Sequence, residues 1–275
     1  MFGASDSISI GPMLPRRRVL GFGVAVCATG CATRTPPPLP PADDAGVDRL
    51  RAALAEAVPQ PPLPDPITQD RIARAMREVA GSGYGIDRPE LIFVVDRHPD
   101  VQAASILLAR PDAPWAVIGG DRVSTGQADR RGYYITPTGV FLHTPAIRDY
   151  RALGTFNRDG IRGLGAQGMR VWDFGWIPAR KGWRDDGETG PIRFLIHATD
   201  PDRLEPLLGR TGSQGCIRIS AAMNLFLDRH GVLDIDHERA LAEGDARMAA
   251  LLRPDRDPTP LAGRALVVID SSDPA

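Results

Sequence analysis

The chain has 275 residues, of which 43% are hydrophobic and 24% are charged, and its formal net charge is −1. This is the composition of an ordinary globular protein, and the near-neutral charge gives no indication of nucleic-acid binding. The 26 prolines and 29 glycines indicate many turns, which is typical of a mostly β domain. We therefore expect one sizeable domain with shorter appendages.

The first 30 residues have the features of an export signal. Arg16-Arg17-Arg18 precede a short apolar stretch at residues 19–26, which is too short to span a membrane as a stable helix. Ala28-Thr29-Gly30-Cys31 resembles a lipobox, the bacterial motif whose cysteine is lipidated. We predict a signal at residues 1–30 and a lipid anchor on Cys31. Conventional cleavage without lipidation is the alternative.

The next segment is rich in proline and then becomes helical in pattern. Five prolines lie within residues 35–41, which predicts an extended tether at residues 31–45. Apolar residues then recur at helical spacing, so residues 46–87 are expected to form two helices that pack on the rest of the chain. The first carries Val47, Leu50, Leu54 and Val58; the second, capped by Thr68, carries Ile72, Ala75, Met76 and Val79.

From residue 88 onwards the apolar pattern is that of β-strands. Runs at residues 91–96, 102–109 and 115–120 have short separations, which favour hairpins over strand–helix–strand units. We predict that residues 88–237 form a mainly β domain, a sandwich or barrel with flanking helices. Residues 238–275 are expected to add a helix at residues 238–252 and a last strand to the sheet.

Cys216 is the one cysteine outside the N-terminal leader. A thiolate attacks carbonyl carbons well, but a free thiol is mostly protonated at neutral pH and needs a base or a positive charge nearby. His197 follows an apolar run at residues 192–196, so it emerges at a strand end and is the candidate base. We expect a nucleophile with a lowered pKa; the alternative is a small buried hydrophobic residue.

The residues around Cys216 suit the same chemistry. Gly212 and Gly215 permit positive φ, so the N–H groups of Gly215 and Cys216 can point at a developing oxyanion. If this stretch is extended, Arg218 shares a face with Cys216 and can hold a substrate carboxylate.

The run Ser213-Gln214-Gly215-Cys216-Ile217-Arg218, preceded by His197, resembles the signature of the YkuD-type L,D-transpeptidases. Residues 123–126 and 136–141 resemble the strand and turn on the substrate side of that family. The similarity spans residues 91–233 and implies a YkuD-like β catalytic domain with Cys216 as nucleophile and His197 as base. Gln214 departs from the pattern, because the family usually has a histidine there, and this affects the substrate contact or oxyanion support at that position.

The resemblance also implies a reaction. Cys216 would attack the carbonyl before a terminal D-amino acid of a peptidoglycan stem peptide, and an amine of a second stem would resolve the thioester into a 3→3 cross-link. The carbonyl of Ala198 would orient the imidazole, and Ser213 and Arg218 would place the donor. Exchange or attachment at the donor carbonyl stays open, as do an L,D-carboxypeptidase or amidase that uses water and a weak wall-binding module. The expected location is the periplasm, with a lipid anchor in a membrane.

The remaining aromatic and histidine residues carry no further chemistry in this interpretation. Residues 144–190 are expected to be irregular, and their three tryptophans either belong to a flap over the groove or anchor an insertion. Because the histidines lack metal-ligand spacing, we expect no metal and no cofactor. The residues concerned are Trp172, Trp176 and Trp183, together with His143, expected to be structural, and His230 and His237, expected at helix ends on the surface.

Overall fold

The structure is a computed structural model, and it describes residues 44–58 and 65–273. The predicted export signal, the lipidated Cys31 and nearly all of the predicted tether lie outside the described residues. Within the described ranges, no helix is long and apolar enough to cross a membrane.

The described residues form a mixed α/β fold rather than the expected mainly β one, because the α-helices hold as many residues as the strands. The helices are α1 (Asp44–Ala57), α2 (Asp65–Ser82), α3 (Ala221–His230), α4 (Ile235–Ala242) and α5 (Ala246–Leu251), with a short 3₁₀ helix at Glu205–Leu207. The strands are β1 (Glu90–Asp96), β2 (Ala103–Ala109), β3 (Ala116–Arg122), β4 (Gly139–Leu142), β5 (Tyr150–Arg151), β6 (Arg170–Arg180), β7 (Thr189–Ala198), β8 (Ile217–Ile219) and β9 (Ala265–Ile269).

The strands form two open sheets. The first sheet has the order β3-β2-β1-β9-β4 and the second has the order β5-β6-β7-β8. Neither sheet closes on itself within the described residues, so the barrel alternative is wrong. Most neighbouring strands are antiparallel, but β1 runs parallel to β9 and β7 runs parallel to β8.

A shared hydrophobic core joins the inner faces of the two sheets. Phe93 and Ile106 of the first sheet belong to the same buried cluster as Phe194 and Ile217 of the second. The sheets therefore pack face to face, as in the predicted sandwich. The first predicted helix is confirmed, because its four apolar residues are all buried in this cluster: Val47, Leu50, Leu54 and Val58.

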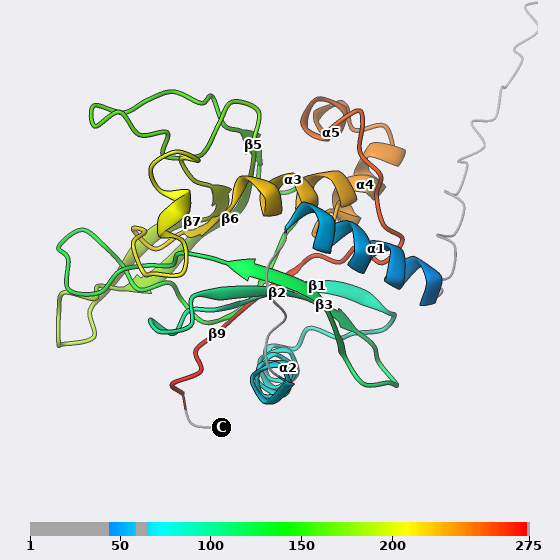
Figure 1. The fold of residues 1–275 in the computed structure, drawn as a ribbon, viewed down its shortest axis with the longest axis horizontal. Coiled ribbons are helices and arrows are strands. Elements are labelled where there is room, and N and C mark those ends of the chain that lie inside the picture. The colour runs from blue at the N-terminus through cyan, green and yellow to red at the C-terminus, as the bar shows by residue number, and fades with distance from the viewer. Residues whose placement is uncertain (1–43, 59–64, 274–275) are drawn as a thin grey trace, which may run out of the picture. The chain divides into compact units, whose positions relative to one another are not determined.

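Helix α2 covers the other face of the first sheet (Figure 1). Ile72, Ala75 and Val79 pack there against strand residues of β1, β2 and β9, as the helical spacing predicts. The helix begins at Asp65 rather than after Thr68. Met76 was assigned to the apolar face but is 44% exposed.

The segment after β8 follows the predicted capping pattern. Ser220 accepts a hydrogen bond from the Met223 N–H at the start of α3, and Gly231 ends the helix in the left-handed conformation. The single helix expected at residues 238–252 is instead α4 and α5, interrupted at Gly244, whose φ is +93°. The last strand, β9, lies between β1 and β4.

The expectation of an irregular stretch at residues 144–190 is wrong for its second half, which contains β6. A bulge between Asp173 and Trp176 shifts the register with β7, and Gly175 takes a φ of +87° there. The bulge interrupts the two-residue alternation by which a strand is recognised in a sequence. Trp172 is fully buried in the core and Trp176 is 66% exposed, so the tryptophans do not share one role.

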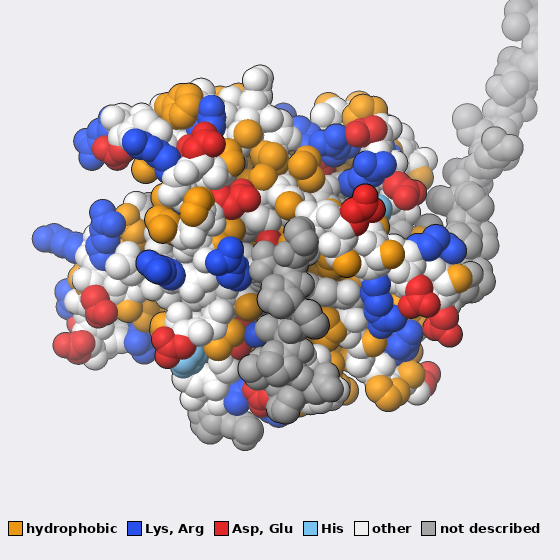
Figure 2. Space-filling model, in the orientation of Figure 1, with side chains coloured by type: hydrophobic (Ala, Val, Ile, Leu, Met, Phe, Trp, Pro, Cys, Tyr) orange, Lys and Arg blue, Asp and Glu red, His pale blue; other side chains and the backbone are white. Residues whose placement is uncertain are grey.

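Charges of both signs are mixed on the surface. On the face shown in Figure 2, Lys and Arg side chains lie among Asp and Glu, with hydrophobic side chains between them. Several large hydrophobic side chains are exposed on β5, β6 and the segment between them: Tyr150, Leu153, Phe156 and Trp176. These segments border the residues that the sequence singles out.

Candidate active site

The second sheet brings the three main candidate residues onto one face. Ile196 of β7 lies opposite Ile217 of β8, and His197 lies opposite Arg218. Because Ile196 and Ile217 point into the core, strand alternation directs His197 and Arg218 to the outer face. Cys216, two residues before Arg218, packs in a separate hydrophobic cluster on that same face. The prediction that Arg218 and Cys216 share a face is confirmed.

His197 is positioned by its neighbour in the chain. Its Nδ1 lies 2.6 Å from the Ala198 carbonyl oxygen, and since a carbonyl only accepts, Nδ1 carries the proton. The Nε2 lone pair is then the one that can accept a proton. Burial lowers the pKa of His197 to about 4, and the positive charge of Arg218 acts in the same direction. The imidazole is therefore neutral at neutral pH and has the tautomer that a general base needs.

The thiol of Cys216 is also neutral. Its Sγ donates to the carbonyl oxygen of Arg193 at 3.3 Å. Burial raises its pKa to about 11, although a backbone hydrogen bond from Leu195 and the charge of Arg218 lower it. The expectation of a lowered thiol pKa is therefore wrong. The pair rests as thiol and imidazole, and a proton must move before Cys216 becomes a nucleophile.

The loop before Cys216 is locked by its own side chains. Ser213 Oγ donates to the Cys216 carbonyl at 2.5 Å and accepts from the Gly215 N–H at 3.1 Å. Gly215 has a φ of +122°, and a Cβ there would lie 2.7 Å from Ile192 Cδ1, so only glycine fits. The Gly215 N–H, predicted to support an oxyanion, is already donated to Ser213. Gln214 is exposed.

The second motif block supports this loop from behind. The carbonyl of Thr125 accepts from the N–H groups of Gly212 and Ser213, each at 2.9 Å. Thr136 Oγ1 donates to the Gly215 carbonyl at 2.8 Å and accepts from the Gly126 N–H. The structure therefore brings together the two blocks that are about 80 residues apart in the sequence.

Gln102 anchors the support, and the sequence carries no signal for it. It is fully buried and has a φ of +41°, which is uncommon for a residue other than glycine. Its Nε2 donates to Thr125 Oγ1 at 2.8 Å and to the Arg97 carbonyl at 2.6 Å, and its Oε1 accepts from the Thr125 N–H at 2.7 Å. Gln102 thus fixes Thr125, which in turn holds the loop that ends at Cys216.

Charged and aromatic side chains lie beside the thiol on the outer face. Arg193 pairs with Asp173 at 2.8 Å, and its guanidinium carbon lies 5.8 Å from the centre of the exposed Trp176 ring. Tyr150 of β5 is 39% exposed, and charges on Asp173 and Cys216 raise its pKa after burial, the main cause. The outer face therefore offers aromatic surface and an ion pair within electrostatic reach of Cys216.

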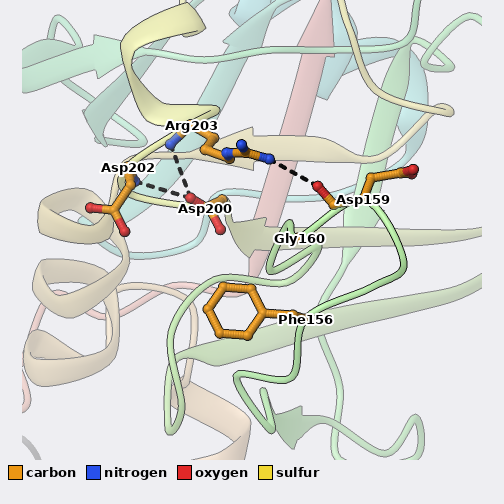
Figure 3. A pocket seen from close by; sticks show the side chains of 6 residues that line it. All are labelled: Phe156, Asp159, Gly160, Asp200, Asp202 and Arg203. Carbon is orange, nitrogen blue, oxygen red and sulfur yellow. Dashed lines mark hydrogen bonds between the residues drawn. The ribbon is translucent and has the colours of Figure 1, made fainter.

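The segment at residues 152–169 covers part of this face. Its Leu164 and Met169 pack against the cluster that includes Cys216. A pocket lies between this segment and the turn after β7 (Figure 3), where Arg203 donates to the Asp159 carbonyl at 2.9 Å. The pocket is lined by Phe156, Asp159, Gly160, Asp200, Asp202 and Arg203. It is therefore mostly polar, and neither Cys216 nor His197 lines it.

The remaining histidines do not all lie where the sequence predicts. His237 was placed at the surface, but it is fully buried. His143 is also buried, as expected for a structural residue, and its ring stacks on that of His237 at 4.1 Å. Although the sequence shows no metal-ligand spacing, the structure places ligand atoms of His143, Asp234 and His237 within 4.8 Å of one another.

Comparisons with known proteins identify no family. No family model matches the chain, and no curated protein matches it. Among solved structures, the chain is similar to a fused Zn-dependent amidase/peptidase/peptidoglycan-binding domain-containing protein from Clostridium acetobutylicum, with 16% identity and a TM-score of 0.27. The match covers 78% of this chain and 66% of that protein, just under two thirds of its length. A TM-score this low establishes neither a shared fold nor a shared function.

Proposed function

We propose that this chain is a cysteine acyltransferase of the L,D-transpeptidase type that acts on peptidoglycan stem peptides. One observation carries the proposal: the parallel register of β7 and β8 places Cys216, His197 and Arg218 on one face, with the Nε2 lone pair of His197 available. The resemblance of residues 213–218 to the YkuD-type signature supports the substrate class.

The proposed reaction begins with a proton transfer. His197 Nε2 takes the proton of Cys216 Sγ as the sulfur attacks the carbonyl carbon before the terminal D-amino acid. The tetrahedral oxyanion is held by backbone N–H groups of the loop, that of Cys216 first, because the Gly215 N–H is engaged by Ser213. The C–N bond then breaks, the amine leaves with the proton from His197, and a thioester remains. An amine of a second stem resolves the thioester, or water does in a carboxypeptidase.

Arg218 has two roles in this proposal. Its positive charge lowers the pKa of both Cys216 and His197, which favours the thiolate and disfavours the imidazolium. Its guanidinium donates to the Gly212 carbonyl at 3.0 Å and keeps other donors for a substrate carboxylate. The first contact stabilises the loop, and the second kind of contact orients the donor peptide.

A wall-binding module without turnover is the second candidate function. The burial of the thiol, its raised pKa and its hydrogen bond to Arg193 favour this candidate, because each keeps Cys216 protonated. Exposed aromatic surface at Trp176 suits contacts with peptide or sugar in either case. The two candidates differ in one observable, a covalent bond to sulfur.

Intact mass after incubation with a carbapenem tests the proposal. The chain carries Cys27→Ala and Cys31→Ala so that Cys216 is the remaining thiol, and Cys216→Ser is the matched control. We expect an adduct of one carbapenem that the control lacks, and cross-linked dimers from tetrapeptide muropeptides. Trimmed tripeptides with the adduct would indicate the hydrolase. Absence of both adduct and product would leave the binding module.

Export and anchoring form a separate part of the proposal. The lipobox-like Ala28-Thr29-Gly30-Cys31 supports a periplasmic protein with a lipid on Cys31. Cys31→Ala should move the protein from the membrane fraction to the soluble fraction. If the variant stays with the membrane, the lipid anchor is wrong, whatever the activity of Cys216.

A further inference from the structure

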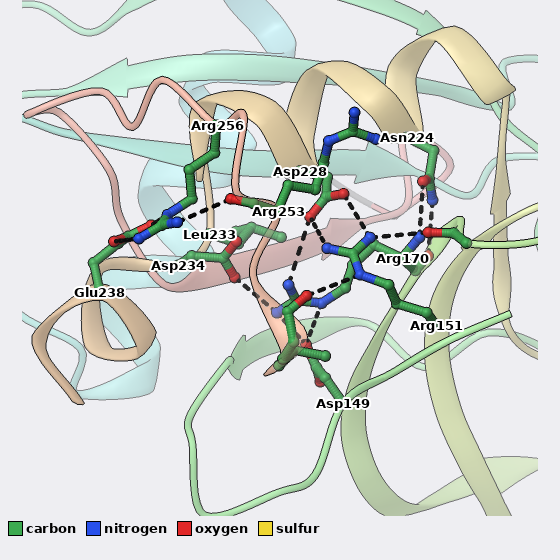
Figure 4. Close-up of polar contacts among 12 residues, drawn as sticks. Asp149, Arg151, Arg170, Asn224, Asp228, Leu233, Asp234, Glu238, Arg253 and Arg256 are labelled. Atoms are coloured by element: carbon green, nitrogen blue, oxygen red, sulfur yellow. Dashed lines mark hydrogen bonds and ion pairs between the residues drawn. The ribbon is translucent and has the colours of Figure 1, made fainter. Parts of the chain in front are cut away.

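A second polar cluster lies in the interior, where the loop after β4 meets β6 and the start of α4. Figure 4 shows Asp149, Arg170, Asp228 and Asp234 converging from separate segments of the chain. All four are buried, with at most 4% of each residue exposed. Arg170 donates to Asp149 at 2.8 Å and lies 3.3 Å from Asp234. Charged groups are rarely placed so deep without a specific partner.

Two residues of this cluster have unused ligand atoms. His237 is fully buried, and neither of its ring nitrogens has a hydrogen-bond partner among the described residues. Asp234 is equally buried, and its Oδ2 has no hydrogen-bond partner there either. Buried polar atoms without partners are costly and call for an explanation such as a bound ion. Because Asp234 and His237 are three residues apart at the start of α4, they lie on the same side of the helix.

His143 completes the set from the other side. Its Nε2 bonds to Asp149 Oδ2 at 2.8 Å, and its Nδ1 faces the Leu233 carbonyl at 2.9 Å and Asp234 Oδ1 at 3.5 Å. A histidine whose far nitrogen donates to a carboxylate has the arrangement that orients imidazole ligands in metal sites. Asp149 would fix the ring, and Nδ1 would face the ion beside Asp234.

The charge of the interior is consistent with a cation. Arg151 pairs with Asp228 at 2.8 Å, which leaves the carboxylates of Asp149 and Asp234 against the single guanidinium of Arg170. A proton on His143 supplies the missing positive charge, because both of its ring nitrogens face acceptor oxygens. A divalent cation bound to the neutral ring would supply positive charge in place of that proton.

We propose that His143, Asp234 and His237 form a binding site for a divalent cation of the kind that prefers imidazole ligands, with Zn²⁺ as the representative ion. Two imidazoles and a carboxylate are a common zinc donor set, and the Leu233 carbonyl is placed to be a fourth ligand. The site is enclosed, so its role is to tie the start of α4 to the loop after β4. It is independent of the proposed reaction at Cys216.

Binding requires two local changes. The Nδ1–H bond of His143 breaks, the proton leaves to solvent, and an Nδ1–metal bond forms, so one proton is released for each ion bound. The ring of His237, which now stacks parallel to that of His143 with an 8° tilt, must turn so that one nitrogen points at the ion. No hydrogen bond of His237 opposes this turn, because neither nitrogen makes one among the described residues.

Metal titration of the full chain tests the site. The chain carries Cys216→Ser, together with Ala at Cys27 and Cys31, so that no thiol binds the ion. We expect one Zn²⁺ per chain after dialysis, a Co²⁺ form with visible absorption bands, and a melting temperature raised by about 5–10 °C at a hundredfold excess over Kd. EDTA should reverse each effect.

Two variants separate the cluster from surface histidines. His237→Ala should lose the bound ion and the thermal shift, whereas His98→Gln, a change at a partly exposed histidine in another region, should keep both. If His237→Ala fails to fold, Asp234→Asn serves, with at least tenfold weaker Zn²⁺ binding expected. The proposal is overturned if the parent chain retains no stoichiometric metal, which would mean that a proton alone occupies His143, or if the His237 variant binds equally well.

Discussion

His197, at the end of β7, and His143, just after β4, are both buried, but their surroundings differ. His197 has the carbonyl of Ala198 as its partner and the positive Arg218 nearby, and burial lowers its pKa to about 4. Burial acts on His143 in the same direction, but Asp149 and Asp234 outweigh it and raise the pKa. The comparison shows that the sign of the neighbouring charge, rather than depth, decides which buried histidine holds a proton.

The same contrast separates the two regions that contain them. On the outer face of the second sheet, thiol and imidazole both rest uncharged, and the one strong ion pair is that of Asp173 with Arg193. In the interior, each charge is matched by an opposite charge within hydrogen-bond distance. Uncharged groups with spare lone pairs can take part in proton transfer, whereas a matched set of charges fixes three segments of the chain to one another.

The largest expected effect comes from removing one charge of the interior. Asp149 accepts from His143, from Arg170 and from the Asp173 N–H, so Asp149→Asn leaves buried cations without their anion. We expect the free energy of unfolding to fall by about 3–5 kcal/mol, measured by urea denaturation. Asp186→Asn, which breaks the exposed pair with Arg184, should change little. Similar small losses for both variants would mean that the interior network is no stronger than a surface pair.

A pH titration of stability sharpens the contrast between the two histidines. The folded pKa of His197, about 4, lies below the unfolded value of about 6.5. The fold therefore favours the neutral ring, and this contribution is present above pH 6.5 and is lost as pH falls towards 4. It amounts to about 3 kcal/mol. His143 has the opposite sign, because its raised pKa contributes stability below the unfolded value that is lost as pH rises through the folded one.

His197→Gln isolates the first of these contributions. Urea unfolding of the parent and the variant at several values between pH 7 and pH 4 should give a shallower decline for the variant, by about 3 kcal/mol across the range. Other buried groups titrate in both proteins, so the difference between them is the measurement. Parallel curves would show that His197 is not the buried neutral base described above.

The sequence was sufficient for features that depend on local periodicity. Alternation in strands placed Arg218 on the face of Cys216, and helical spacing identified the buried residues Val47, Leu50 and Leu54. The capping of α3 by Ser220 followed from the residue type alone. In each case the relevant neighbours are within a few residues of one another, so the sequence pattern contains the information.

Features that depend on distant contacts were missed. The bulge at Gly175 hid β6, the tertiary environment of Gln102 left no trace in the sequence, and His237 looked like an ordinary helix-end residue. The pKa of Cys216 was predicted in the wrong direction, because the motif identifies the base but not how deeply the thiol is packed. Burial and partner identity are set by tertiary contacts that no short pattern encodes.

A smaller effect is expected from the support behind the candidate site. Gln102→Ala removes three hydrogen bonds and keeps a positive φ on a residue with a Cβ, whereas Gln102→Gly removes the same bonds but relieves the backbone. We expect a loss of about 1–3 kcal/mol for Ala and about 1 kcal/mol less for Gly. Both should slow carbapenem acylation of Cys216 equally, since the amide is absent in each. If acylation follows stability instead, Gln102 only stabilises the fold.

The smallest effect expected is on the thiol itself. Asp173 raises the pKa of Cys216 and Arg218 lowers it, but both act less than burial does. Asp173→Asn should therefore increase the rate of iodoacetamide alkylation at pH 8 severalfold, and Arg218→Gln should decrease it, while the unfolded chains react alike. A faster rate without faster acylation would show that the thiolate population does not limit the reaction. The arrangement of His197 Nε2 and the loop N–H groups would then be the limiting feature, because a nucleophile that is easily ionised still needs a held carbonyl and a stabilised oxyanion.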